Sequence, residues 1–136
     1  MGYNSHNMTN RSDDWFKQAK RDLEQAAASQ RDNYHEWACF AAHQTAEKAL
    51  KALHSYFGQE ACKRVVARVM IELSDRVSFP ENLMEKGRVL DNYYIPSRYP
   101  YGHPSGAPFE HYGSIQSSQA IEYAREVFEF VHLQMA

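Results

Sequence analysis

The segment from Asn33 to Phe57 constrains the fold more than any other part of the sequence. Its apolar side chains recur every three or four residues, which indicates one long amphipathic α-helix. Many of these positions carry alanine, and small side chains let neighbouring helices approach closely. Asn33 and Glu36 have the spacing of a capping box, and Gly58 is placed to end the helix. We therefore expect this helix to be the central member of a bundle.

Four further segments share the helical periodicity: residues 12–29, 65–77, 79–90 and 114–136. Ser12, Asp13 and Asp14 offer capping oxygens and negative charge to the first of them. Ser78 and Glu81 have the spacing of a second capping box, with Pro80 in the first turn of the short segment 79–90. No strand is predicted. The sequence thus indicates an all-α, up-and-down bundle of four long helices with one additional short helix.

Length and composition restrict the organisation and the class of protein. A chain of 136 residues suits one domain, which we expect over residues 12–136 after a flexible tail of residues 1–11. The net charge of −2 excludes a broad basic surface, so any nucleic acid must bind at a local site. No segment reaches the about 20 apolar residues of a membrane span, and we expect a cytoplasmic protein. Cys39 and Cys62 are expected to be reduced, structural thiols.

The segment from Asp91 to Gly113 is the candidate site, because it is long, aromatic and without hydrophobic periodicity. It contains four of the five prolines and a single cation, Arg98. Its aromatic side chains are Tyr93, Tyr94, Tyr99, Tyr101, Phe109 and Tyr112. Aromatic rings beside an arginine can stack the bases of single-stranded RNA. The same rings can instead pack the loop onto the bundle or form a dimer interface.

Two sequence motifs resemble a known family. The first is FAAHQTAEKALKAL, from Phe40 to Leu53, and the second is DNYYIPSRYP, from Asp91 to Pro100. Together they resemble the HEPN family of small prokaryotic helical domains, in the branch with an Arg-Tyr-Pro loop. The resemblance covers almost the whole chain from Trp15 onward.

The resemblance implies a bundle of four or five helices that is frequently a homodimer. Such proteins are often encoded beside a minimal nucleotidyltransferase as a toxin and antitoxin pair. Many are metal-independent endoribonucleases that use an arginine and a histidine with four to six residues between them. Others bind nucleotides or partner proteins without cutting RNA. The resemblance implies no cofactor for either chemistry.

Arg98 and His103 have the spacing of the nuclease pair. Metal-free RNA cleavage needs a base, an acid and a cation at the phosphorus centre, and imidazole and guanidinium groups suit these roles. One such pair supplies a single histidine, so two loops facing each other across a dimer would complete the set. Arg125 and His132, with six residues between them, also fall within the family range, but they lie in a predicted helix. His111 is a further histidine of the loop that we expect to face solvent. Arg98 can instead be a structural cation held by tyrosines.

Two lysines of the central helix look like phosphate contacts in the HEPN resemblance. Lys51 also stands four residues after Glu47, which is the spacing of an ordinary ion pair on a helix. The predicted nucleotide-binding or RNA-binding residues are Lys48, Lys51, Tyr94, Arg98, Tyr99 and Tyr101.

Two other charged or polar groupings are weaker candidates. One is a stripe at intervals of four on the central helix, formed by His35, Cys39, His43 and Glu47. This stripe lacks the His-Glu-x-x-His signature of zinc sites, so we predict no metal. The other is the basic cluster Lys63, Arg64 and Arg68. Such a cluster can guide RNA, although a solvated helix face is the commoner explanation.

Overall fold

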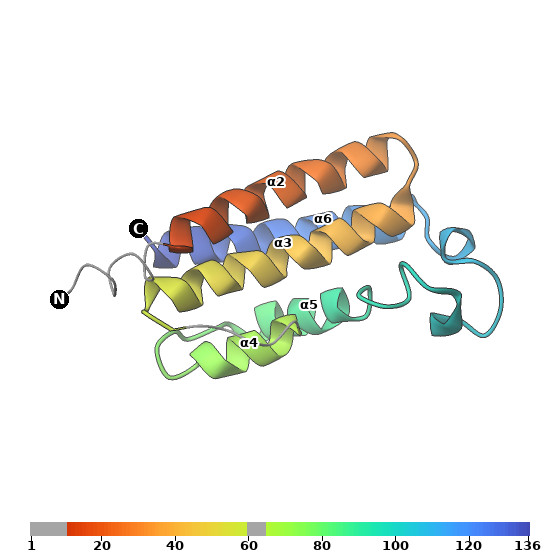
Figure 1. The fold of residues 1–136 in the computed structure, drawn as a ribbon. Coiled ribbons are helices and arrows are strands. Elements are labelled where there is room, and N and C mark those ends of the chain that lie inside the picture. Colours follow the sequence, from red (N-terminus) through yellow and green to blue (C-terminus); the bar gives the residue numbers. More distant parts are fainter. Residues whose placement is uncertain (1–10, 60–64) are drawn as a thin grey trace.

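The computed structural model describes residues 11–59 and 65–136, and no strand occurs in those ranges (Figure 1). Its α-helices there are α2 (Arg11–Arg31), α3 (His35–Tyr56), α4 (Val66–Leu73), α5 (Glu81–Asp91) and α6 (Ser114–Gln134). Two 3-10 helices, η1 (Pro100–Gly102) and η2 (Pro108–His111), lie between α5 and α6. The predicted all-α fold is confirmed, although α4 and α5 are both short.

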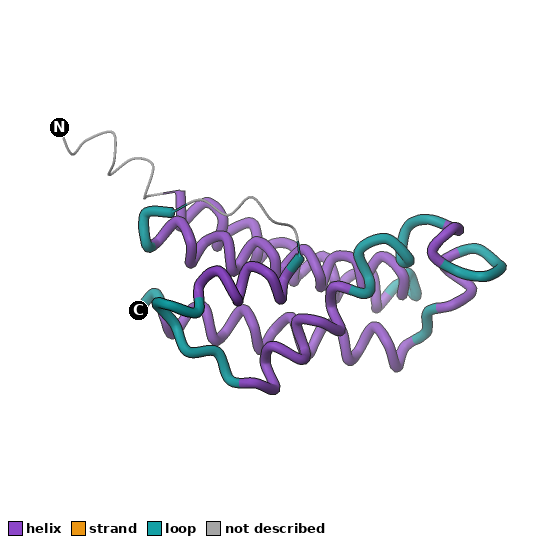
Figure 2. Tube along the Cα trace, turned by 90° about the horizontal axis from the view of Figure 1, so that it is seen from below, coloured by secondary structure: helices purple, strands orange, loops and turns teal. Residues whose placement is uncertain are grey.

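The central helix of the bundle is α3, as its alanine content predicts. It contacts α2, α4, α5 and α6, and the long helices α2 and α6 run alongside it (Figure 1). Ala42, Ala46 and Ala49 are fully buried on this helix, beside the buried Leu50 and Leu53. Small side chains let the neighbouring backbones come close while the leucines fill the core. Figure 2 shows the same bundle turned by 90°, with the loop between α5 and α6 extending from one end.

The capping box predicted at Asn33 is wrong. Asn33 has a φ of 68° and ends α2 instead of starting α3. The N–H of Tyr34 donates to the C=O of Ser29 at 2.8 Å, and the N–H of Asn33 donates to the C=O of Gln30 at 3.0 Å. This is a Schellman motif, whose left-handed position asparagine tolerates better than most residues. Gly58, with a φ of 76°, ends α3 with the same pattern of bonds, as predicted.

The second predicted capping box, at Ser78, is also wrong. Helix α5 begins at Glu81, and no side-chain hydrogen bond caps its start. Pro80 occupies the N-cap position with a ψ of 144°, outside the helical region. A proline at this position gives up no hydrogen bond of the helix, because the first N–H groups of a helix have no partner within the helix.

Two other helix ends differ from the predicted ones. Helix α2 already includes Arg11, the last residue of the predicted tail, so Ser12 lies inside the helix. Residues 1–10 of that tail lie outside the described residues. Helix α4 ends at Leu73, four residues before the predicted end. Ser74 follows it, and its hydroxyl donates to the C=O of Ile71 at 2.7 Å. Such a local bond competes with continuation of the helix.

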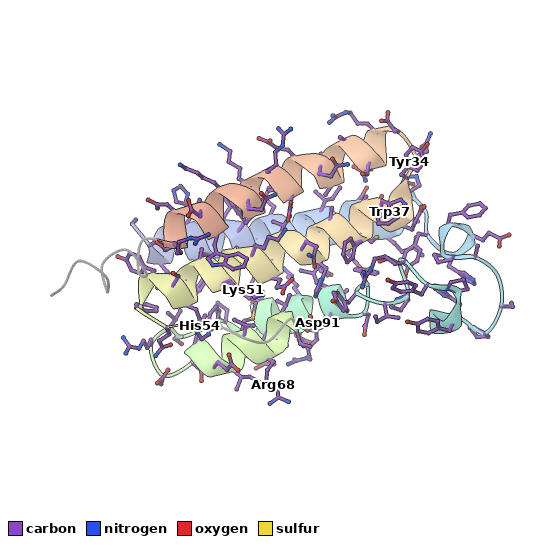
Figure 3. All side chains as sticks on the ribbon, in the orientation of Figure 1. Tyr34, Trp37, Lys51, His54, Arg68 and Asp91 are labelled. Carbon is purple, nitrogen blue, oxygen red and sulfur yellow. The ribbon has the colours of Figure 1, made fainter. Side chains whose placement is uncertain are left out.

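Asp91, the last residue of α5, connects three helices (Figure 3). Its carboxylate accepts hydrogen bonds from the N–H groups of Val66 and Ala67, at 2.6 and 3.1 Å. These are the first residues of α4, so Asp91 caps this helix from a distance. The same carboxylate lies 3.1 Å from Nε2 of His43, a fully buried side chain of α3. Asp91 therefore fixes the point at which the loop leaves the bundle.

His54 is a buried histidine of α3 that faces α4. Its side chain is 5% exposed, and its Nε2 lies 3.6 Å from the carboxylate of Glu72. Burial lowers the pKa of His54, against the opposing influence of the Glu72 and Asp75 carboxylates and of the Val69 backbone. The folded protein therefore resists protonation at this position more than the unfolded chain does.

We expect the free energy of unfolding to fall as the pH drops below about 6.5, the pKa of a free histidine. A lowered pKa contributes stability above the unfolded pKa and loses it as the pH falls through the folded pKa, at no more than about 1.4 kcal/mol per pH unit. Urea unfolding of wild type and His54→Leu between pH 8 and pH 5 measures this slope. The slope should be smaller in His54→Leu than in wild type. Equal slopes in wild type and His54→Leu would contradict the prediction.

No helix within residues 11–59 and 65–136 is both long and apolar enough to cross a membrane.

Candidate functional site

Arg98 lies among aromatic rings contributed by the loop and by α3. Its guanidinium carbon is 4.3 Å from the ring centre of Phe40, 4.6 Å from that of Tyr94 and 5.0 Å from that of Tyr99. Its Nε donates to the C=O of Tyr94 at 2.9 Å. These contacts hold the cation by cation–π attraction and one hydrogen bond. Among the described residues, no carboxylate forms an ion pair with Arg98.

Tyr99 and Tyr101 extend this arrangement outward. Their rings stack at 5.5 Å between centres with an angle of 14° between planes. Tyr101 is 77% exposed and Tyr99 is 40% exposed. An exposed aromatic face beside an arginine suits the stacking of an unpaired base. We call Phe40, Tyr94, Arg98, Tyr99 and Tyr101 the Arg98 cluster.

Tyr93 and Tyr112 have a different role in the same loop. Their rings meet edge to face at 5.9 Å, and both pack against the core of the bundle. Burial raises the pKa of each phenol to about 12, so both stay neutral at physiological pH. The loop aromatics thus divide into a pair that anchors the loop and a group that surrounds Arg98. Phe109 belongs to neither group and is 65% exposed.

His103 and His111 form a stacked pair within the loop. Their ring centres are 4.0 Å apart, and their planes differ by 2°. His103 donates from Nε2 to the C=O of Pro96, and His111 donates from Nε2 to the C=O of Ser105, both at 2.6 Å. A carbonyl only accepts, so Nε2 carries a proton in each ring and Nδ1 is the position left to exchange one. The sequence predicts a solvent-facing His111, and the structure shows an exposed ring that also has a partner.

Gly102 allows the loop to turn back onto itself. A Cβ at this position would lie 2.8 Å from the backbone Cα of Pro96, closer than real contacts allow. Only glycine therefore lets η1 approach Pro96, whose carbonyl holds His103.

Gly102→Ala is expected to displace η1 and to separate His103 from His111. The Cε1–H signals of the two histidines in a carbon–proton correlation spectrum report this change, because stacked rings shift each other's resonances. Gly58→Ala is the matched control, since a Cβ at Gly58 meets no atom within 4 Å. It should cost about 1–2 kcal/mol of stability through its left-handed φ and leave the histidine signals in place. Unchanged histidine signals in Gly102→Ala would rule out the tight turn.

Lys48 and Lys51, the two lysines predicted to contact phosphate, each form an ion pair with a carboxylate. The ammonium of Lys48 lies 2.6 Å from the carboxylate of Asp22 on α2. Lys51 forms an ion pair with Glu47 at 2.9 Å, as the spacing allows, and its ammonium lies 5.1 Å from the ring centre of Trp15. It stands 11 residues after Phe40 (51 − 40), or about 16 Å along the helix axis. The structure thus does not bring Lys51 to the Arg98 cluster.

The two histidines of the predicted stripe on α3 contact side chains outside the stripe. His35 is within 2.9 Å of the hydroxyl of Ser117, and His43 pairs with Asp91. Cys39 is fully buried, and burial raises the pKa of its thiol to about 12. Across residues 11–59 and 65–136, no group of three or more potential ligands is placed to hold a metal ion.

The other candidate charges lie away from the loop. Arg125 is exposed on α6, and His132 packs near Phe16, with 5.3 Å between ring centres. Arg68 is exposed on α4 (Figure 3), whereas Lys63 and Arg64 fall outside the described residues.

Phe40 is the residue of the cluster that sequence reasoning missed. It comes from α3, 58 residues before Arg98 (98 − 40), and no local pattern pairs the two. The one available signal was its place at the start of the first family motif.

The fold and the loop together define a class: an all-helical domain that presents an arginine among aromatic rings at one end of its bundle. The chain matches the HEPN domain over residues 12–134 and belongs to the HEPN domain family.

Solved structures of similar proteins agree with this assignment. TT1696 from Thermus thermophilus is 41% identical, with a TM-score of 0.88 over 90% of this chain and 97% of that chain. ST0689, an archaeal HEPN homologue, is 34% identical, with a TM-score of 0.80 over 93% and 98% of the two chains. The HEPN domain protein TM0613 from Thermotoga maritima is 33% identical, with a TM-score of 0.72 over 87% and 93%. No curated protein matches the chain.

Proposed function

We propose that this HEPN protein binds single-stranded RNA at the Arg98 cluster. The observation that carries the proposal is a half-buried guanidinium held by three aromatic rings and free of any ion pair among the described residues. Arginine presents planar donors to phosphate oxygens, and the exposed stack of Tyr99 and Tyr101 suits an unpaired base. Because the chain carries a net charge of −2, binding must rely on this local site.

A second candidate function is metal-independent cleavage of the bound RNA, and the His103–His111 stack favours it. The base takes the proton of the 2′-hydroxyl, the 2′-oxygen bonds to phosphorus, and the bond to the 5′-oxygen breaks as that oxygen gains a proton from the acid. Arg98 would neutralise charge on the non-bridging oxygens. The second imidazole can come from His111 of the same chain, or from a second copy in the homodimer that the family resemblance implies.

Binding and cleavage are tested with one fluorescent single-stranded RNA. Its anisotropy is measured against protein concentration, and its integrity is followed on a gel in excess chelator. Binding with chelator-resistant cutting that is lost in His103→Ala supports the nuclease. Binding without cutting supports the alternative, a non-catalytic module that holds RNA or a nucleotide or docks a nucleotidyltransferase. Absence of binding by folded protein refutes the proposed function.

A further inference from the structure

We propose that a groove between α2 and α3 is a subsite for one nucleobase of the bound RNA. The groove has a volume of about 480 Å³, within the range of small-molecule sites. The lining residues that matter here are Gln25, Tyr34, Trp37, Phe40, Gln44 and Lys48. The proposal rests on RNA binding at the Arg98 cluster, and it adds where a base of that RNA is held.

The walls of the groove offer exposed aromatic surface. Tyr34 is 57% exposed and Trp37 is 48% exposed, and both sit where α2 turns into α3 (Figure 3). They are three residues apart and so lie on the same face of the chain as it enters α3. The Trp37 and Phe40 rings are nearly perpendicular, at 82° with 6.1 Å between ring centres, so they do not stack face to face on each other. A flat, uncharged heterocycle is the ligand that such walls fit.

Two side-chain amides supply hydrogen-bonding groups at the groove. Gln25 donates from its amide nitrogen to Ser29 at 2.9 Å. Gln44 uses its amide oxygen toward Nδ1 of His43 at 3.3 Å. Within the described part of the chain, the oxygen of Gln25 and the nitrogen of Gln44 have no hydrogen-bond partner. These two amides therefore offer an acceptor and a donor, and the edges of nucleobases carry both kinds of group.

The charge of the groove favours a base over a phosphate. Among the described residues that line the groove, Lys48 is the one cation, and Asp22 already neutralises it at 2.6 Å. Phe40 lines the groove and also lies 4.3 Å from the guanidinium of Arg98. Phe40 therefore stands between the groove and Arg98. Arg98 is the cation that would meet the phosphate of a nucleotide whose base enters the groove.

Trp37 reports occupancy of the groove directly. Trp15 and Trp37 are the two tryptophans, so Trp15→Phe leaves Trp37 as the only indole. Unlabelled oligoadenylate, a single-stranded RNA of twelve nucleotides, is titrated into this protein while Trp37 emission is followed. We expect saturable quenching by stacking, with a midpoint equal to the affinity measured by anisotropy. Binding seen by anisotropy with constant Trp37 emission would overturn the subsite and leave the proposed function standing.

The RNA affinity of single-site variants that keep Trp15 provides a second measurement. Trp37→Leu should weaken binding of the same RNA about tenfold or more, because stacking on one aromatic residue contributes that much. Tyr56→Ala is the control, since Tyr56 is 41% exposed near the other end of α3. Equal affinities for wild type and Trp37→Leu overturn the subsite. Absence of RNA binding by the wild type overturns the subsite and the proposed function together.

Discussion

Arg98→Ala is expected to weaken the binding of single-stranded RNA by about 10- to 100-fold. A hydrogen bond to a charged group contributes about 1.5–3 kcal/mol, and about 1.4 kcal/mol is a factor of ten in affinity. Arg98→Lys should recover only part of the loss, because an ammonium keeps the charge but not the planar donors that lie over the rings of Phe40 and Tyr94. Fluorescence anisotropy at fixed salt measures all three proteins.

Arg125→Ala is the matched control for Arg98→Ala. Arg125 is also an arginine followed by a histidine at the family spacing, but it is exposed on α6. It should leave RNA affinity within about twofold of wild type, since a distant surface charge is screened by salt. Equal affinities for Arg98→Ala and Arg125→Ala would refute the assignment of the phosphate site to the loop.

Asp91→Asn is expected to lower the free energy of unfolding by about 3 kcal/mol. Asparagine has an NH2 group in place of one carboxylate oxygen, so it cannot accept from both the Val66 and the Ala67 N–H groups, and one lost hydrogen bond costs about 1 kcal/mol. The carboxylate also faces the buried His43, and a hydrogen bond that involves a charged group contributes about 1.5–3 kcal/mol. Asparagine keeps the shape of the side chain but loses the charge, so packing defects do not account for the change. Urea unfolding of the two proteins measures the difference.

Asp32→Asn makes the same chemical change at an exposed turn position. It should alter stability by less than about 0.5 kcal/mol, as surface substitutions usually do. A double-mutant cycle with His43→Phe separates the histidine contact from the helix cap, because residues in contact show a coupling energy. A loss of less than about 1 kcal/mol in Asp91→Asn would show that the carboxylate is not what joins the three helices.

The helices were predictable because periodic burial of apolar side chains leaves a direct signal in the sequence. The sequence predicts a helix contact face that contains Ala42, Ala46 and Ala49, and these alanines are fully buried. The helix ends were harder. Asn33 and Glu36 have the spacing of a capping box, but Asn33 takes a left-handed conformation that ends the preceding helix. The cap of α4 could not be found locally, because Asp91 reaches it from 25 residues along the chain.

The candidate site was predictable from its composition and not from its contacts. The sequence indicates Arg98 with Tyr94, Tyr99 and Tyr101, and these four residues do lie together. Neighbouring residues of one loop stay close in almost any conformation. The stack of His103 on His111 was not predictable, since it depends on the course of an irregular loop.

The start of α2 and the end of α6 lie together at the end of the bundle opposite the loop (Figure 1). Phe16 of α2 contacts His132 of α6, with 5.3 Å between ring centres. Helix α6 has 21 residues, or about 30 Å of length, between that end and the loop. A dye, an affinity tag or a fused reporter joined after Ala136 would therefore sit far from Arg98. Immobilisation on a sensor surface through that point would leave the loop facing solution.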